Sequence, residues 1–147
     1  MILLEPHSFD PYAHLSAFSR ETGGAGAIAS FIGVVRGDRK DVRALFLDHF
    51  PGVTERAIKG AAAEAEGRWP LLGLRIVHRV GETPVGEPVV LVTTAAAHRR
   101  AAFEACDFLM DYLKTDAPFW KKEISGEGEV WIEPRAKDYA DRARWSK

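Results

Sequence analysis

Runs and alternations of apolar residues predict four strands in the first two thirds of the chain. Residues 27–35 and 89–95 are mostly apolar, which is typical of strands covered on both faces. Residues 45–50 and 74–80 instead alternate between the two faces of a strand. A turn at 83–86 separates the third strand from the fourth, and we expect the fourth to lie centrally in a sheet.

Two helices are predicted from the signals at their ends. Asp10 can cap a first helix in which Pro11 occupies the first position, and Gly23 ends it. Thr54 is expected to cap a second helix, which runs to about Trp69. The many alanines of this second helix indicate close packing against a sheet.

A third helix has the clearest pattern, and it ends before Pro118 because the residue preceding a proline avoids the helical conformation. Four apolar residues recur at helical spacing and predict a buried face: Phe103, Cys106, Met110 and Leu113. A second apolar row and the opposite polar face follow the same spacing: Ala102, Ala105, Leu109 and Tyr112 in the row, and Arg100, Glu104, Asp107, Asp111 and Lys114 opposite. This helix is therefore expected to cover a sheet.

The rest of the chain predicts a hairpin and then a charged tail. A strand that begins at Phe119 leads to a turn at 126–128 and a return strand at 130–132. Residues 134–147 are charged and are expected to form a loose helix. Together the elements predict an α+β fold in one domain, residues 1–147, with a mixed sheet, three main helices mostly on one side of it, and a C-terminal β-hairpin.

Length and composition narrow the class of protein. The 147 residues suit one domain that needs no metal or disulfide to fold. With 20 Lys and Arg against 21 Asp and Glu, the chain lacks the basic excess of a general nucleic-acid binder. It has one cysteine, no signal-peptide pattern and no apolar run of about 18 residues to span a membrane, so we expect a cytoplasmic protein.

Common enzyme motifs are absent from the sequence. It contains no glycine-rich phosphate loop, no nucleophile elbow and no zinc-binding His-Glu-x-x-His, and neither a metal nor an organic cofactor is predicted. Cys106 lies on the apolar side of its helix and is expected to be a packing residue. His78 alternates with apolar residues, which favours a core or interface histidine over a ligand.

Basic residues at two strand ends are candidates for a binding site. Arg36 follows the first strand, and His98 and Arg99 lie where the fourth strand gives way to the third helix. A helix N-terminus binds anions, whereas cations placed there oppose the helix dipole unless an anion is held. These residues suit an anion site, but solvated surface arginines explain them equally well. Arg100 is expected to pair with Glu104.

Two lysines near the end of the third helix are candidate catalytic groups. Lys114 lies in the last turn, where the helix dipole alone favours a cation. Lys121 follows Phe119 and Trp120, which can form an apolar wall. Burial against that wall and a second nearby cation would lower the pKa of Lys121 and supply a nucleophile or a proton-transfer group near neutral pH.

Four segments of the chain resemble the large, catalytic subunit of the molybdopterin synthase family. They are residues 31–37, 47–55, 76–82 and, most specifically, 97–123. The segments match in order over most of the chain. The resemblance implies an α/β-hammerhead fold, which is compatible with the elements predicted above.

The same resemblance implies an activity and its partners. The family makes molybdopterin, the dithiolene ligand of the molybdenum cofactor, from a cyclic pyranopterin monophosphate. A small ubiquitin-like sulfur-carrier subunit delivers the two sulfurs as a thiocarboxylate on its C-terminal Gly-Gly. We therefore expect a heterotetramer built on a homodimer of this chain, and no need for a catalytic cysteine in it.

The family's active-site residues can be matched to this chain one by one. Its catalytic lysines match Lys114 and Lys121, and its substrate-binding positions match Val34, Val35, Arg36, His98, Arg99, Lys122 and Glu123. Some members carry a basic residue in place of Val34, so a side-chain phosphate contact is ruled out at this position here. Since the family's sites lie near the dimer interface, one protomer is expected to contribute Arg36 and the lysines, and its neighbour His98 and Arg99.

The expected roles follow from charge. Arg36, His98 and Arg99 would clamp phosphate or a developing anion. One lysine would meet the thiocarboxylate and the other would transfer protons at the pterin side chain, with the assignment between Lys114 and Lys121 open. A non-catalytic subunit that binds a phosphorylated metabolite or a carrier tail is the alternative. An RNA-binding domain is disfavoured by the charge balance and by the lack of an aromatic, basic strand pair.

Overall fold

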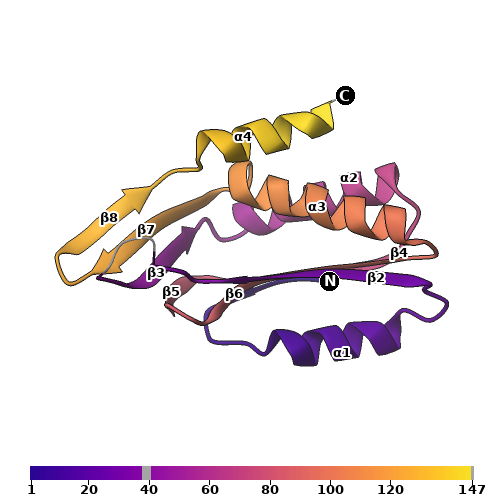
Figure 1. The fold of residues 1–147 in the computed structure, drawn as a ribbon, viewed down its shortest axis with the longest axis horizontal. Coiled ribbons are helices and arrows are strands. Elements are labelled where there is room, and N and C mark those ends of the chain that lie inside the picture. Colours follow the sequence, from indigo (N-terminus) through magenta and orange to yellow (C-terminus); the bar gives the residue numbers. More distant parts are fainter. Residues whose placement is uncertain (38–40, 147) are drawn as a thin grey trace.

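The computed structural model describes residues 1–37 and 41–146 as two β-sheets with helices packed on them (Figure 1). Residue 147, the last of the charged tail, lies outside the described residues. The elements follow in the order β1 (Ile2–Glu5), α1 (Pro11–Glu21), β2 (Ala27–Val34), β3 (Val42–His49), α2 (Val53–Arg68), β4 (Leu71–Arg79), β5 (Gly81–Pro84), β6 (Pro88–Ala96), α3 (Arg99–Thr115), β7 (Phe119–Ser125), β8 (Gly128–Ile132), α4 (Ala136–Ala143) and the short 3-10 helix η1 (Arg144–Ser146).

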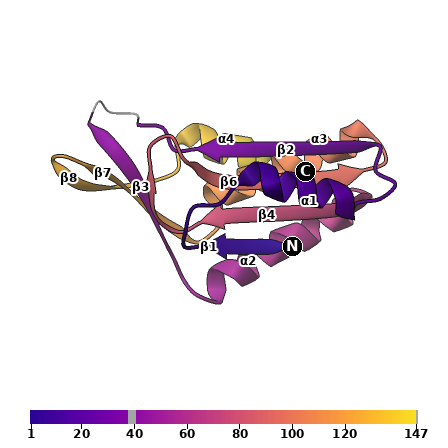
Figure 2. The same cartoon turned by 90° about the horizontal axis from the view of Figure 1, so that it is seen from below.

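The first sheet, sheet A, has the strand order β1-β4-β6-β2. It is mixed, as the sequence predicted, because β1 runs parallel to β4 while the other neighbours are antiparallel. The helices α2, α3 and α4 lie on one side of it, and α1 covers the middle of the opposite side (Figures 1 and 2). The predicted α+β class and the central position of β6 are confirmed.

The prediction of one sheet is wrong, because the hairpin strands join a second sheet. Sheet B is antiparallel with the order β5-β3-β7-β8. Two of the described strands were missed: β1, which is short, and β5, whose residues overlap a predicted turn. Gly81 has a φ of 82°, and this left-handed conformation redirects the chain from β4 in sheet A to β5 in sheet B.

The main core lies between sheet A and the helices α2 and α3. Ile58 and Ala65 of α2, Phe108 of α3 and Val92 of β6 are fully buried there. The alanines of α2 allow the close packing that the sequence predicted. Cys106 is buried in this core, also as predicted.

Two predictions about single residues are wrong. Thr54 does not cap α2, because the helix begins at Val53 behind Gly52. The Thr54 hydroxyl is fully buried; it accepts the backbone N–H of Phe50 at 2.9 Å and donates to the carbonyl of Pro118 at 3.0 Å. Phe103, predicted in the core, keeps 60% of its side chain exposed.

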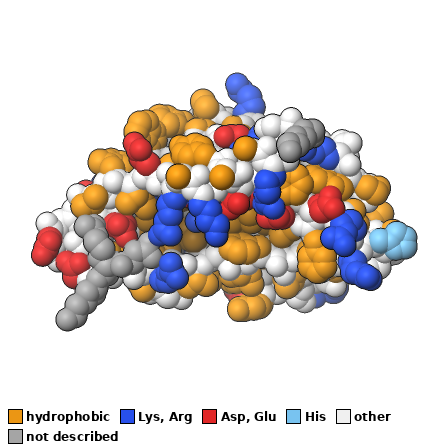
Figure 3. Space-filling model, turned by 45° about the horizontal axis from the view of Figure 1, so that its top comes forward, with side chains coloured by type: hydrophobic (Ala, Val, Ile, Leu, Met, Phe, Trp, Pro, Cys, Tyr) orange, Lys and Arg blue, Asp and Glu red, His pale blue; other side chains and the backbone are white. Residues whose placement is uncertain are grey.

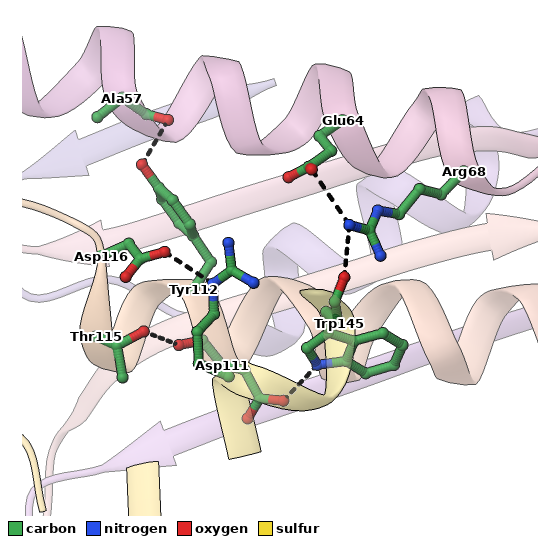
Figure 4. Close-up of polar contacts among 9 residues, drawn as sticks. Ala57, Glu64, Arg68, Asp111, Tyr112, Thr115, Asp116 and Trp145 are labelled. Atoms are coloured by element: carbon green, nitrogen blue, oxygen red, sulfur yellow. Dashed lines mark hydrogen bonds and ion pairs between the residues drawn. The ribbon is translucent and has the colours of Figure 1, made fainter. Parts of the chain in front are cut away.

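The charged tail is an ordered part of the helical layer. Arg142 donates to Asp116 at 2.7 Å, and the Trp145 indole donates to Asp111 at 2.6 Å (Figure 4). Arg68 of α2 donates to the backbone carbonyl of Trp145 at 2.7 Å. These contacts fix α4 and η1 against α2 and α3. None of the described helices is long and apolar enough to cross a membrane.

Candidate active site

A cavity of about 500 Å³ lies where the two sheets meet beneath the helical layer. Its walls come from the end of β2, from β3 and β7 of sheet B, from the last turns of α3, and from the segment that leads into α4. The basic residues among its walls are Arg36, Lys114, Lys121 and Arg135. Figure 3 shows Lys and Arg side chains gathered around a hollow on one face of the molecule. Three acidic residues, Glu123, Glu133 and Asp138, also line the cavity, so the four basic residues leave a small excess of positive charge for an anionic ligand.

Lys121 extends into this cavity from β7. It is half-buried, and burial is the main cause that lowers its pKa to about 8. The positive charge of Lys114 lowers it further, while Asp138 of α4 opposes the shift. The pKa of Lys121 is thus lowered by the two causes that the sequence suggested, burial and a neighbouring cation.

Lys114 reaches the same cavity from the last turn of α3 and is exposed. The two lysines also line a recess of about 60 Å³ that adjoins the main cavity. His78 of β4 and Met110 of α3 lie on the wall of this recess. Two cations from different elements are therefore brought to one small volume, where one lowers the proton affinity of the other.

The alternation of side chains along β7 separates the residues that follow Pro118. Lys121 and Glu123 point into the cavity, whereas Lys122 points to the outer face of sheet B. There Lys122 forms an ion pair with Glu129 at 2.8 Å and lies over the rings of Phe46 and Trp131. The expectation that Lys122 contacts the substrate from the same site is not supported by this geometry.

Of the two residues predicted to form an apolar wall beside Lys121, only Phe119 lies on its side of the strand. Phe119 lies on the inner face and stacks on His78, with ring centroids 4.4 Å apart. Trp120 is on the outer face, 56% exposed, in edge-to-face contact with Phe50 and Trp131. The residues that enclose Lys121 therefore come from β3, sheet A and α3 rather than from Trp120.

The substrate loop predicted at the end of β2 lies in the cavity wall. Val34 is 52% exposed, and Arg36 is exposed beside it. Val35 is 5% exposed, and its backbone N–H and C=O bond to Glu87 and Gly86 at 3.0 and 2.8 Å. Val35 therefore fixes the strand end, and Val34 and Arg36 present the surface that a ligand can reach.

The predicted anion residues His98 and Arg99 lie at the other end of α3. Both are exposed, and neither lines the cavity. Arg99 is the first residue of α3 and Lys114 is the last but one, so their backbones are about 22 Å apart at the usual rise per residue. One chain does not bring the two halves of the predicted site together. Arg100 pairs with Glu104 at 4.0 Å, as expected.

Sequence reasoning missed several residues of the cavity. Met110, Glu133, Arg135 and Asp138 line it, and two of these, Arg135 and Asp138, belong to the tail that was expected to be loose. His78 was expected to be a core or interface histidine, and it is buried. Its Nδ1 bonds to the carbonyl of Arg79 at 2.9 Å, and burial lowers its pKa to about 4. The position of His78 against the lysine recess has no signal in the sequence.

Cys106 takes no part in the cavity. Its thiol donates to the carbonyl of Val92 at 3.7 Å, and burial raises its pKa to about 12. Among the described residues, no group of three or more His, Cys, Asp or Glu could hold a metal ion. The charged groups that line the cavity are two amines, two guanidinium groups and three carboxylates.

The family model described as MoaE protein matches residues 4–116 of the chain. A protein from Pseudomonas aeruginosa named molybdopterin synthase catalytic subunit is 50% identical over 99% of this chain and 99% of its own length. The solved MoaE protein of Burkholderia ambifaria is 44% identical, covers 99% of this chain and 97% of its own, and has a TM-score of 0.82.

A further solved structure shares the fold at 20% identity. It is a complex of subunits 1 and 2 of the molybdopterin-converting factor from Helicobacter pylori, with a TM-score of 0.80 over 91% of each chain. The family model covers well over half of the chain, and the Pseudomonas relative matches along its whole length. This chain belongs to the MoaE family of molybdopterin synthase catalytic subunits.

Proposed function

We propose that the chain is a catalytic subunit that converts a cyclic pyranopterin monophosphate to molybdopterin in the cytoplasm. The sulfurs come from a thiocarboxylated small carrier subunit. The pairing of Lys114 with Lys121, whose pKa is lowered to about 8, carries the proposal. A non-catalytic binding subunit needs cations in this cavity but gains nothing from a lysine that titrates near neutral pH.

The chemistry follows from the charges in the cavity. Lys114 is exposed in the cavity wall and meets the carrier's thiocarboxylate, whose carbonyl it polarises. The thiocarboxylate sulfur forms a bond to a carbon of the pterin side chain as a carbon–oxygen bond at that carbon breaks and the oxygen leaves as water or with the phosphate. Water then cleaves the bond between that sulfur and the carrier's acyl carbon, which leaves a carboxylate on the carrier and a thiolate on the pterin. A second carrier repeats these steps for the second sulfur. Lys121, whose pKa of about 8 lies close to neutral pH, takes up and returns the protons of these steps.

The phosphate site is proposed to need two protomers. Arg36 lies in the cavity wall, while His98 and Arg99 lie a helix length away in the same chain. A second copy that presents its His98 and Arg99 to Arg36 would complete a cluster of three basic groups. Glu123 faces the same cavity and can accept hydrogen bonds from the pterin.

The activity is tested by mixing the dimer with thiocarboxylated carrier and the cyclic precursor and measuring dithiolene product. Lys114→Ala and Lys121→Ala should each lower turnover by about 10²–10⁴-fold, the usual loss when a positioned proton-transfer group is removed. Near-normal turnover by both variants would contradict the catalytic roles. Binding of precursor by the wild-type protein without any product would favour the non-catalytic alternative.

Subunit exchange tests the shared site. An Arg99→Ala dimer and a Lys121→Ala dimer should each be weak, but a mixed dimer rebuilds one intact site of its two. Random reassortment makes half of the dimers mixed, so about a quarter of the wild-type rate should return. Demonstrated exchange without recovery would show that each site is built within one protomer.

A further inference from the structure

The recess beside the two lysines contains a polar group that the chemistry above does not use. His78 at the end of β4 is 5% exposed, and its side chain lines this recess of about 60 Å³. Its ring stacks on Phe119 of β7, with the centroids 4.4 Å apart. β4 belongs to sheet A and β7 to sheet B, so the imidazole is held at the junction of the two sheets.

One hydrogen bond fixes the tautomer of His78. Its Nδ1 lies 2.9 Å from the backbone carbonyl of Arg79, and a carbonyl oxygen can only accept, so Nδ1 carries the proton and donates it. Nε2 is then left with a free lone pair and can only accept. Burial is the main cause that lowers the pKa of His78 to about 4, so the ring stays neutral near neutral pH.

Nε2 of His78 has no protein partner, yet it is not sealed in the interior. Among the described residues, the bond to Arg79 is the only hydrogen bond that this imidazole makes. The unpartnered side-chain atoms that are closed off in this part of the chain are Nε of Arg75, Nε of Arg79 and Oγ1 of Thr83, and Nε2 is not one of them. Since the recess is the open space that His78 lines, the free lone pair is available there.

The chemistry of the recess selects its ligand. Its other polar groups are the amines of Lys114 and Lys121, and the remaining wall residues are apolar. A ligand must therefore donate to Nε2 and also bond to an amine. A thiocarboxylate or a phosphate dianion has no proton to donate, whereas water both donates and accepts. The recess has room for water but not for a pterin, and three polar groups match the roughly three hydrogen bonds of a buried water.

We propose that the recess is a water site, in which His78 and Lys121 orient the water that cleaves the carrier's acyl–sulfur bond. The recess opens into the main cavity, because Lys114, Lys121 and Met110 line both spaces. A water held there is next to the amine that meets the carrier's carbonyl. The role in cleavage rests on the proposed function, whereas the water site rests on the recess and its polar groups alone.

The step balances without a further reactant. The water oxygen bonds to the acyl carbon as the carbon–sulfur bond breaks, and the electrons of that bond leave with the sulfur as the pterin thiolate. The neutral amine of Lys121 takes one proton of the water, and the new carboxylic acid releases the other to solvent. Nε2 of His78 accepts a hydrogen bond and stays unprotonated, so it directs a lone pair of the water oxygen toward the acyl carbon.

Three substitutions at His78 isolate the acceptor. His78→Gln brings an amide oxygen to the place of Nε2, and His78→Met has nearly the same shape without an acceptor. His78→Phe keeps a ring that can stack on Phe119 but has no nitrogen. His7→Phe, in the exposed segment before α1, is the control. All four variants should keep the circular dichroism spectrum of the wild type.

Crystal structures test the water site independently of activity. An ordered water within hydrogen-bond distance of Nε2 and of Lys121 is expected in the wild type. A water at the same place is expected in His78→Gln but not in His78→Met or His78→Phe. Bromide soaked into wild-type crystals should give no anomalous signal in the recess. A wild-type recess without water, a bromide bound there, or a water that stays in place in both His78→Met and His78→Phe would overturn the site.

A single turnover, quenched in acid and followed by the intact mass of the carrier, tests the role of this water. In water labelled with heavy oxygen, decay of the wild-type carrier–pterin adduct should add one labelled oxygen to the carrier. In His78→Met and His78→Phe the adduct should form within about twofold of the wild-type rate but decay about 10²-fold more slowly, because the reacting water has lost its position. His78→Gln should recover decay to within about tenfold, and His7→Phe should change neither step.

The two measurements separate the water site from the proposed function. If the water follows the variants as expected but the wild type forms neither adduct nor product, the water site stands and the proposed function fails. If the wild type turns over but His78→Met and His78→Phe cleave the adduct at the wild-type rate, the proposed function stands and the role of the water is overturned. Equal slowing of both steps, as a distorted cavity would cause, would overturn that role as well.

Discussion

Arg79 donates a hydrogen bond of 2.7 Å to Glu87, and the backbone carbonyl of Glu87 accepts the N–H of Val35 at 3.0 Å. Arg79 also donates to the carbonyl of Glu82 at 2.9 Å. Its side chain is nearly buried between the end of β4 and the start of β6. The guanidinium of Arg79 therefore connects β5, where the chain passes from sheet A to sheet B, with Glu87, which in turn holds Val35, the residue before Arg36.

We expect Arg79 and Glu87 to position Arg36. Glu87→Gln keeps the size of the side chain but removes the charge, so the strand end should loosen and kcat/KM for the precursor should fall about tenfold, mainly through KM. In an Arg36→Ala background the same change should have little further effect, because residues that act through one another are not additive. Glu127→Gln in the exposed hairpin turn is the control. Fully additive effects in the double variant would refute the positioning role.

The charged amine of Lys121 is expected to lower the free energy of unfolding at neutral pH. Its pKa is lowered from 10.5 to about 8 in the folded chain. Between these two pH values the unfolded chain therefore keeps a proton on Lys121 that the folded chain has lost. Stability should therefore rise as pH increases from about 8 to about 10.5.

Replacing Lys121 with an uncharged side chain should remove this destabilisation. Lys121→Met should raise the free energy of unfolding at pH 7 by up to about 3 kcal/mol while activity is lost. The gain should shrink as the pH approaches 10.5, the ordinary pKa of a lysine. Denaturant unfolding at several pH values measures this difference. A variant that is less stable than wild type at pH 7 and equally so at high pH would show that burial does not penalise the charged amine.

A Lys122 variant tests whether the two faces of β7 have different roles. Lys122→Ala removes an ion pair with an exposed glutamate and two cation–aromatic contacts on the outer face of sheet B. We expect turnover within about twofold of wild type and a loss of about 1 kcal/mol of stability. Steady-state kinetics beside Lys121→Ala checks this contrast. A loss of turnover as large as that of Lys121→Ala would return Lys122 to the active site.

The sequence pattern was sufficient where burial follows from local sequence alone. The apolar run of β6 predicted a strand buried on both faces, and the apolar rows of α3 predicted its buried side except at Phe103. The cavity depends on long-range pairing instead. β3 brings β7 alongside it, with Leu47 opposite Lys121, and this register is set by strands about 75 residues apart in sequence.

Other errors have similar physical causes. Helical periodicity predicted Phe103 to be buried because it cannot tell where a sheet ends, and α3 lies over the sheet's margin. The tail was expected to be loose because its contacts, such as Arg142 with Asp116, join residues distant in sequence. The family resemblance indicated two groups of residues for the proposed active site, and in one chain these groups lie about the length of α3 apart.

Cys106 provides the last test, because a sulfur-transfer protein with a single cysteine invites a persulfide mechanism. The thiol is buried against Val92, and its pKa of about 12 leaves almost no thiolate at neutral pH. Cys106→Ala should therefore keep at least half of the wild-type turnover and lose about 1 kcal/mol of stability through the small cavity it leaves. Cys106→Asp, which buries a charge, is expected to unfold the chain and shows that the position is structural. Mass spectrometry of the wild-type protein after a single turnover should find no added sulfur on this chain. A folded Cys106→Ala protein that transfers no sulfur, or a persulfide on Cys106, would mean that the sulfur passes through this residue rather than directly from the carrier.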